Sequence, residues 1–147
     1  MRSHRVKTVV MGCTAAALAV AGVSASASPG VPSPAQVVAV DCFSGAQVRP
    51  GDFLLACGDG NNRLTALHWS SWGAASATGS GIDAVNDCQP DCATGKFRSF
   101  PVTVRLDRPE AWRKHPGMQR FTRLRLVYTD SRPAQIQQRE VAYQLWD

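Results

Sequence analysis

The sequence predicts an all-β protein, a single small sandwich or barrel of about six to seven mostly antiparallel strands stabilised by disulfides. Apolar and polar residues alternate with a period of two in several short segments, as in strands with one buried face. No segment keeps the 3.6-residue period of a long amphipathic helix. Four cysteines follow an N-terminal export signal, and an even number of cysteines is typical of small exported domains.

The first 27 residues (1–27) are predicted to be a signal peptide, so that the mature chain begins at Ser28. Basic residues precede an apolar run from 9 to 23, and Ala25-Ser26-Ala27 forms a small-residue cleavage site. The run is shorter than the roughly 20 apolar residues of a membrane span. Cleavage for lipid attachment at Cys13 would leave most of the run on the product. We therefore expect a secreted protein with no membrane segment after signal cleavage.

The mature chain is predicted to consist of a flexible leader (28–36) and a single β domain (37–147). The leader is rich in Pro, Ser and Gly. In the domain, residues 58–62 are dense in Gly, Asp and Asn and indicate a hairpin turn. The segments with a strand pattern are 38–42, 53–57, 64–72, 102–106, 124–128 and 141–145.

The sequence also predicts the structure of two further segments, a thin strand and a short helical turn. Residues 74–81 are almost all small, which favours packing of a thin strand against large neighbours. The aromatic residues that could cover this strand are Trp69, Trp72, Phe97 and Phe100. Between two of the strands, Pro109 opens a segment in which residues 110–114 are expected to form one helical turn.

The four mature cysteines predict two disulfides in an oxidising compartment. Three connectivities are possible, and we favour Cys42–Cys57 with Cys88–Cys92, because Pro90 supplies a turn inside the short second loop. A crossed pairing of Cys57 with Cys88 or Cys92 is the alternative. No metal site is expected, since export favours oxidation over zinc binding and the aspartates between 59 and 91 lack EF-hand spacing.

Charge is unevenly distributed along the chain. Residues 41–91 contain six acidic residues and two arginines, whereas residues 96–147 contain eleven basic and five acidic residues. Such charges most often form solvated faces with cross-strand pairs. The alternative is an anionic cell-wall partner. Nucleic acid is not expected, because no recognition motif is present.

The sequence contains no evident catalytic constellation, and no cofactor is expected. His68 shares strand parity with Ser70, but a Ser–His pair also needs an orienting third group and an oxyanion hole. Candidate ligand contacts are Trp69, Trp72 and Trp112. Positions three apart in a regular strand point to opposite faces, so without a bulge the Trp69–Trp72 pair cannot form one flat surface. One ring is then expected in the core and the other partly exposed. Core or interface filling is the alternative role for these rings.

Four sequence blocks support a resemblance. They include Trp-Ser-Ser-Trp-Gly at 69–73 and Asn-Asp-Cys-Gln-Pro-Asp-Cys-Ala-Thr-Gly at 86–95, together with the blocks at 55–60 and 100–104. As a set they resemble a group of small exported actinobacterial proteins over residues 42–133. The resemblance implies export and a shared fold, and it implies no activity.

These observations favour a secreted, disulfide-stabilised β domain that is not an enzyme and that binds or coats an unknown extracellular or cell-wall partner. A secreted protease inhibitor is the alternative, because the loop from Cys88 to Cys92 has the rigidity of an inhibitor loop. A small hydrolase using His68 is a further alternative. The ligand and the oligomeric state stay open.

Overall fold

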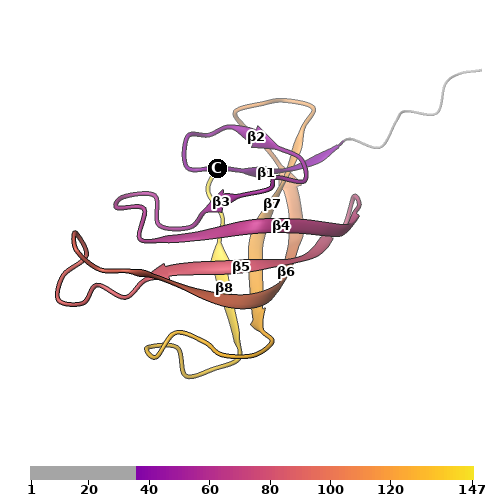
Figure 1. Ribbon diagram of the computed structural model, residues 1–147. Helices are drawn as coiled ribbons and strands as arrows, with labels where there is room; N and C mark the ends of the chain where they lie inside the picture. The colour runs from indigo at the N-terminus through magenta and orange to yellow at the C-terminus, as the bar shows by residue number, and fades with distance from the viewer. Residues whose placement is uncertain (1–35) are drawn as a thin grey trace, which may run out of the picture. The chain divides into compact units, whose positions relative to one another are not determined.

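The computed structural model describes residues 36–147, and this range contains eight strands and no helix (Figure 1). The predicted signal peptide and all but the last residue of the predicted leader lie outside the described residues. The strands are β1 (Val37–Val40), β2 (Ala46–Gln47), β3 (Phe53–Leu54), β4 (Asn62–Trp72), β5 (Ala77–Asn86), β6 (Phe97–Ala111), β7 (Gln119–Tyr128) and β8 (Glu140–Gln144). The all-β prediction is confirmed.

The strands form one sheet in the order β2-β1-β7-β6-β5-β4-β3, and β8 pairs with β7 off this path. β7 has three neighbours, because β6 runs along one edge while β1 and β8 share the other. β1 is parallel to β7, and all the other pairings are antiparallel. Among residues 36–147, no helix is long and apolar enough to cross a membrane.

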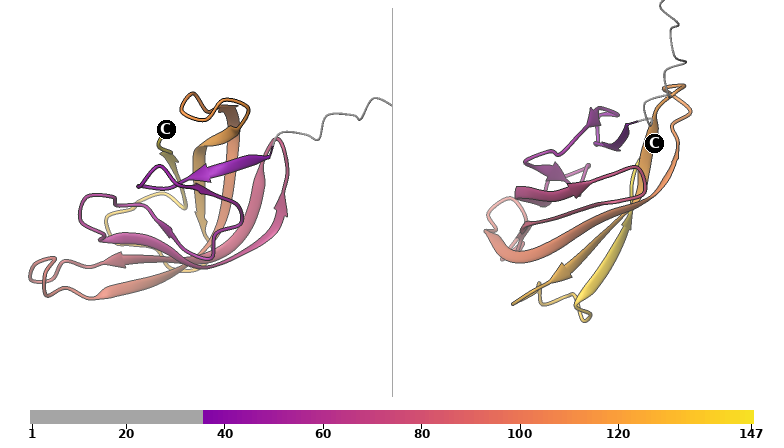
Figure 2. Two further views of the ribbon diagram at one scale, coloured as in Figure 1. Left: turned by 90° about the horizontal axis from the view of Figure 1, so that it is seen from above. Right: turned by 90° about the vertical axis from the view of Figure 1, so that its right-hand side faces the viewer.

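The long strand β6 connects the two halves of the sheet. It pairs with β5 from Phe97 to Leu106 and with β7 from Val102 to Ala111. In Figure 1, β4 and β5 run across the direction of β7 and β8, and β6 bends from one direction into the other. Figure 2 shows the resulting curl of the sheet into a half-barrel.

The hydrophobic core fills the inner face of this half-barrel. Leu64, Val104 and Leu126 are completely buried there, whereas Arg105 and Arg125, which alternate with core residues, lie on the outer face. Burial of each aliphatic side chain contributes about 1.5–3 kcal/mol. The period-two alternation in the sequence therefore arises because successive side chains point alternately into the core and toward the outer face, as predicted.

The two tryptophans of β4 depart from the expected geometry. The register of β4 against β5 shifts between Thr65 and His68 and again between Trp69 and Ser71. Because the second bulge adds a residue between the two rings, it reverses the alternation. Trp69 and Trp72 consequently both pack against the core, with ring centroids 4.7 Å apart in an edge-to-face arrangement. The prediction that they point to opposite faces is wrong.

Two glycines of β5 lie very close to β4, but their nearest neighbours are His68 and Leu67 and not the aromatic rings that the sequence suggests as covers. A Cβ atom on Gly79 would lie 2.5 Å from the carbonyl oxygen of His68. A Cβ atom on Gly81 would lie 2.8 Å from Cδ2 of Leu67. Glycine therefore allows β4 and its inward-facing side chains to approach the backbone of β5 closely.

Both disulfides join the cysteines that the sequence favours, Cys42 with Cys57 and Cys88 with Cys92. The first disulfide connects the turn after β1 to the segment between β3 and β4. The second closes a short loop between β5 and β6, in which the two cysteines are four positions apart.

The prediction of a helical turn at 110–114 is wrong. β6 continues to Ala111, which pairs with Gln119 of β7. The backbone N–H of His115 then donates to the carbonyl of Trp112, and the N–H of Trp112 donates to the carbonyl of Met118. The segment therefore closes a β-hairpin, since extending an existing ladder is more favourable than nucleating a single helical turn.

Charged side chains on the outer face form the cross-strand pairs that the sequence favours. Asp107 accepts hydrogen bonds from Arg123 at 2.7 Å, Arg125 at 3.1 Å and Arg105 at 3.3 Å. Arg125 also pairs with Glu140 of β8 at 3.3 Å. The hydrogen bond from Arg123, more than any other contact, lowers the pKa of Asp107.

Candidate functional site

Two adjoining hollows border the loop between β7 and β8, residues 129–139. The inner hollow has a volume of about 350 Å³ and the outer hollow about 550 Å³, and both lie within the range of about 300–1,000 Å³ that is typical of ligand pockets. Val85, Pro133 and Gln135 line both hollows, so the two adjoin each other. We call the pair the end groove.

The inner hollow combines apolar walls with a few polar groups. Its apolar walls come from Leu55, Ala56, Val85, Pro133 and Ile136, and its polar groups come from Asn62, Gln135 and Tyr143. The hollow lies where the two ends of the half-barrel approach each other. Leu55 directly follows β3 and Tyr143 belongs to β8, and nearby the rings of Phe53 and Trp146 are 6.0 Å apart. Apolar walls with a small number of hydrogen-bonding groups are typical of ligand sites.

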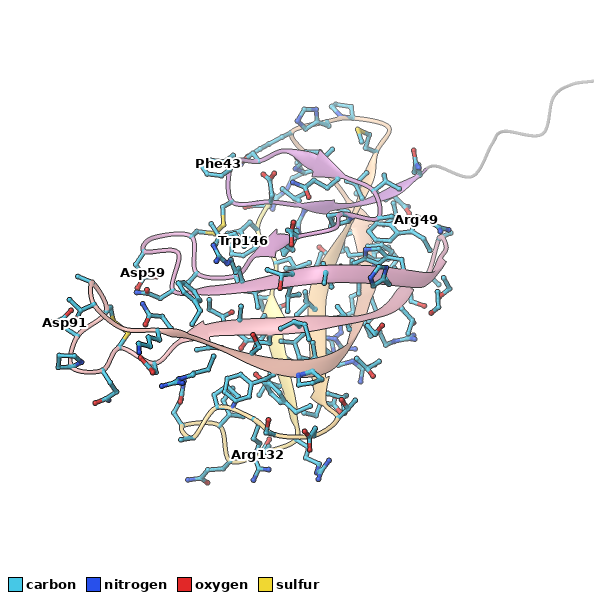
Figure 3. The ribbon with its side chains drawn as sticks, in the orientation of Figure 1. Phe43, Arg49, Asp59, Asp91, Arg132 and Trp146 are labelled. Carbon is cyan, nitrogen blue, oxygen red and sulfur yellow. A yellow bond between two sulfur atoms is a disulfide. The ribbon has the colours of Figure 1, made fainter. Side chains whose placement is uncertain are left out.

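The outer hollow lies between the β7–β8 loop and the disulfide loop that follows β5. Arg132 and Ala134 line it from the first loop, and Cys88 and Gln89 line it from the second. In Figure 3, Arg132 marks the β7–β8 loop and Asp91 marks the tip of the disulfide loop beyond the ends of β5 and β6. The walls of this hollow are therefore loops, whereas its floor includes residues of β5 and β6 such as Phe100.

The disulfide loop is stabilised by hydrogen bonds of the Asn86 and Asp87 side chains at its start. The Asn86 amide donates to Asn61 and to the Cys92 carbonyl, both at 2.8 Å. One carboxylate oxygen of Asp87 accepts from the backbone N–H of Lys96 at 2.9 Å and of Gln89 at 3.2 Å. The Lys96 hydrogen bond, more than any other contact, lowers the pKa of Asp87. Together with the disulfide, these bonds give the outer hollow a fixed wall.

A buried carboxylate lies beside the inner hollow. Asp83 on the inner face of β5 is completely buried. The Tyr128 hydroxyl donates to one of its oxygens at 2.6 Å, and the amide of Asn62, which also lines the hollow, donates to the other at 2.9 Å. Burial raises the pKa of Asp83, and the two hydrogen bonds oppose this rise. The folded chain thus keeps a polar group inside its core, bonded to a residue of the inner hollow.

Tyr143 is the polar group best placed to contact a ligand in the inner hollow. Burial raises the pKa of its hydroxyl, and the nearby Asp83 carboxylate raises it further. The phenol therefore stays protonated near neutral pH. Within residues 36–147 no hydrogen bond is made by this hydroxyl, so its donor and acceptor capacity is available to a bound molecule.

The structure gives packing roles to the three tryptophans predicted as ligand contacts. Trp69 donates its indole N–H to the carbonyl of Pro50 at 2.9 Å, and Trp72 donates to that of Val37 at 2.8 Å. Trp112 is 2% exposed and lies in a separate cluster, packed with residues of β1. The three rings do not form one surface, and none of them lines the end groove.

His68 lies away from the end groove, in a shallow groove on the other side of β4 and β5. It pairs in register with Ser80, whereas the hydroxyl of Ser70 donates to the carbonyl of Thr78 at 3.0 Å. In the described part of the chain, no hydrogen bond orients the imidazole of His68. The arrangement therefore lacks the ordered base that nucleophilic catalysis needs.

Comparison with known protein families, with curated proteins and with solved structures finds no match to this chain. The geometry of the end groove is therefore the basis on which a function can be proposed.

The end groove is not predictable from the sequence. Its walls come from segments near 55, 62, 85–89, 98–100, 132–136 and 143, which are far apart in the chain. The sequence blocks at 55–60, 86–95 and 100–104 overlap three of these segments, but none of them implies a ligand. The one usable signal was the position of the cysteines, because Cys88 lines the outer hollow and Cys57 follows a wall segment of the inner one.

Proposed function

We propose that this chain is a secreted binding protein without catalytic activity, and that it holds an elongated ligand in the end groove. The observation that carries the proposal is that the two hollows adjoin and share Val85, Pro133 and Gln135 as lining residues. A compact small molecule would fill one hollow, whereas a ligand that occupies both must be extended.

The two disulfides support both parts of the proposal. Disulfides form and persist outside the reducing cytoplasm, which agrees with secretion. They also lie at the two ends of the end groove, close to Leu55 at one end and lining the hollow with Cys88 at the other. Walls that are fixed before binding reduce the ordering cost of association.

The experiment is a titration of the ¹⁵N-labelled protein, with both disulfides formed, followed by amide chemical shifts. The probes are blocked di- and tripeptides in one series and N-acetylglucosamine oligomers in the other. We expect one series to shift amides around Val85, Gln135, Ile136 and Tyr143. Shifts that gather instead around His68 on the outer face would overturn the proposal. It would also be overturned if neither these probes nor poly(glycerol phosphate) caused any shift at millimolar concentration.

A matched pair of variants localises the binding. Ile136→Asn places a polar group in the inner hollow, and Val127→Asn makes a similar change on the outer face, where Val127 is 39% exposed. We expect the first variant to weaken binding about tenfold and the second to leave it unchanged. Tryptophan fluorescence of each variant verifies that it is folded.

The disulfide loop supports a second candidate, a secreted protease inhibitor. Residues 89–94 are exposed, and Asp91 fixes the loop by accepting hydrogen bonds from the backbone of Ala93 and from the backbone and hydroxyl of Thr94. A rigid, exposed loop is what an inhibitor presents to a protease. Incubation with subtilisin and trypsin decides this candidate, because unchanged proteolytic rates at micromolar protein would exclude inhibition of these enzymes.

A further inference from the structure

We propose that the ligand of the end groove is an extended peptide segment with a free carboxylate, which binds in the outer hollow while a neighbouring apolar side chain occupies the inner hollow. This inference rests on the proposed function, because it names the ligand class of the same groove.

Two arginines, Arg98 and Arg132, line the outer hollow. Arg132 donates through Nε to the carbonyl of Ile136 at 3.0 Å, and Arg98 donates through Nε to Asp87 at 2.8 Å. These bonds fix the base of each guanidinium. The terminal nitrogens make no hydrogen bond to any residue of the described range, and such paired donors match the two oxygens of a carboxylate.

The acidic residue in the outer hollow does not compete with an incoming anion. Both oxygens of Asp87 are already occupied, one by backbone N–H groups and the other by Arg98. Arg132, in contrast, has no ion-pair partner within residues 36–147. The outer hollow therefore carries a net positive charge that comes from Arg132 and is complementary to a carboxylate.

The inner hollow fixes the direction in which the ligand lies. Its walls are apolar, and the Asp83 carboxylate is bonded to Asn62, a lining residue. A second carboxylate in this hollow would lose its hydration and face a like charge. An apolar side chain fits there instead, with the Tyr143 hydroxyl available to the ligand backbone.

Two observations favour a peptide over a glycan. Sugar recognition commonly uses exposed aromatic faces, and Trp69, Trp72 and Trp112 are committed to packing. β8 pairs with β7 along one edge, and in the described part of the chain no strand pairs with its other edge. An extended peptide can form main-chain hydrogen bonds with such an edge.

The test uses two pools of N-acetylated tetrapeptides that lack Asp and Glu and differ only in a free acid or an amide at the C terminus. Binding is measured by amide chemical shifts and by displacement of a fluorescent member of each pool. We expect the acid pool to bind about tenfold more tightly than the amide pool, because only the acid makes a charge-assisted bidentate bond.

The variant Arg132→Gln removes the unpaired charge of the outer hollow. We expect it to reduce the preference for the acid pool to less than about threefold. The matched control is Arg113→Gln, since Arg113 is exposed in the turn after β6, at the opposite end of that strand from Arg98. The control should keep the full preference.

Each outcome separates this inference from the proposed function. Equal binding of both pools at the end groove, or an Arg132→Gln variant that keeps its preference for the acid pool, would refute the inference of a carboxylate ligand. The proposed function, an elongated ligand in the end groove, would still stand. Tight binding of poly(glycerol phosphate) at the groove with no binding of either peptide pool would also end the inference, in favour of an anionic wall polymer. No binding by any of these probes, or by the sugars, would overturn both proposals.

Discussion

Replacement of Tyr128 by phenylalanine tests how the fold tolerates a completely buried carboxylate. Tyr128 is itself fully buried, and its hydroxyl lies 2.6 Å from an oxygen of Asp83. A hydrogen bond to a charged group contributes about 1.5–3 kcal/mol, and Tyr128→Phe leaves one oxygen of the buried Asp83 without this donor. We therefore expect Tyr128→Phe to lower the free energy of unfolding at pH 7 by about 2–3 kcal/mol, which corresponds to a Tm decrease on the order of 10 °C.

The loss should depend on pH in a defined direction. Burial raises the pKa of Asp83 above its ordinary value of 3.8, so the folded state binds this proton more tightly than the unfolded chain. The contribution of Asp83 to stability therefore decreases as the pH rises from 3.8 through the folded-state pKa. Tyr128→Phe removes a hydrogen bond that lowers this pKa. The variant should consequently lose stability more steeply with rising pH, and its difference from the wild type should be larger at pH 7 than at pH 3.

Urea unfolding at both pH values, followed by tryptophan fluorescence with the disulfides intact, measures these differences. Tyr143→Phe is the matched control, because the same hydroxyl is removed at a residue that makes no hydrogen bond to Asp83; its effect should be smaller and less dependent on pH. Asp83→Asn supplies the second comparison, since it removes the charge and keeps an acceptor for Tyr128. An equal loss of stability at pH 3 and pH 7, or a loss below about 0.5 kcal/mol at pH 7, would refute this reasoning. Asp83 would then not be a buried charge that the Tyr128 hydrogen bond stabilises.

Three further changes test the packing and the outer-face charges. Gly79→Ala should destabilise the protein by about 1–3 kcal/mol in urea unfolding, because its Cβ atom would lie 2.5 Å from the His68 carbonyl oxygen; an unchanged midpoint would show that β4 can move away. The pKa of Asp107 is lowered, so its contribution to stability is present above pH 3.8 and is lost as the pH falls through the folded-state value. Asp107→Asn should therefore flatten the acid limb of a curve of stability against pH. Its loss of stability at neutral pH should be about 1 kcal/mol, because Arg123 and its neighbours are partly exposed. Trp72→Phe should cost about 1 kcal/mol or more in thermal unfolding, since it leaves a β1 carbonyl without its indole donor, and no change in Tm would argue that water replaces the bond.

The parts of the fold that the sequence predicted are those with a local cause. Alternation at Val102, Val104 and Leu106 follows from the side-chain period of a strand, and all three residues are buried as expected. The short disulfide was also predictable, because Cys88 and Cys92 are close along the chain and can reach each other in a turn. In these cases, neighbours in the sequence decide the structure.

The parts that the sequence did not predict depend on distant segments. The bulge between Trp69 and Ser71 has no sequence signature of its own, yet it turns Trp72 toward the core. From the sequence, Asp83 is only one of the aspartates between 59 and 91 that were tested against EF-hand spacing. Nothing near it in the sequence indicates that Tyr128, forty-five residues later in the chain, donates a hydrogen bond to it. The parallel contact of β1 with β7 similarly joins residues 37–38 to residues 119–120. Such contacts are set by the closed packing of the core.

Both disulfides lie in or next to segments that make little or no strand pairing. β3 has two residues, and the loop from Asp87 to Lys96 pairs with no strand, yet these regions supply walls of the end groove. On a loop-entropy basis, Cys42–Cys57 contributes about 3 kcal/mol and Cys88–Cys92 about 2 kcal/mol. The shorter loop gives the second disulfide the smaller effect on the unfolded chain, and in the folded chain this disulfide constrains a segment that pairs with no strand. In the proposed binding function, this constraint keeps one wall of the outer hollow ordered before a ligand binds, which reduces the ordering cost of association.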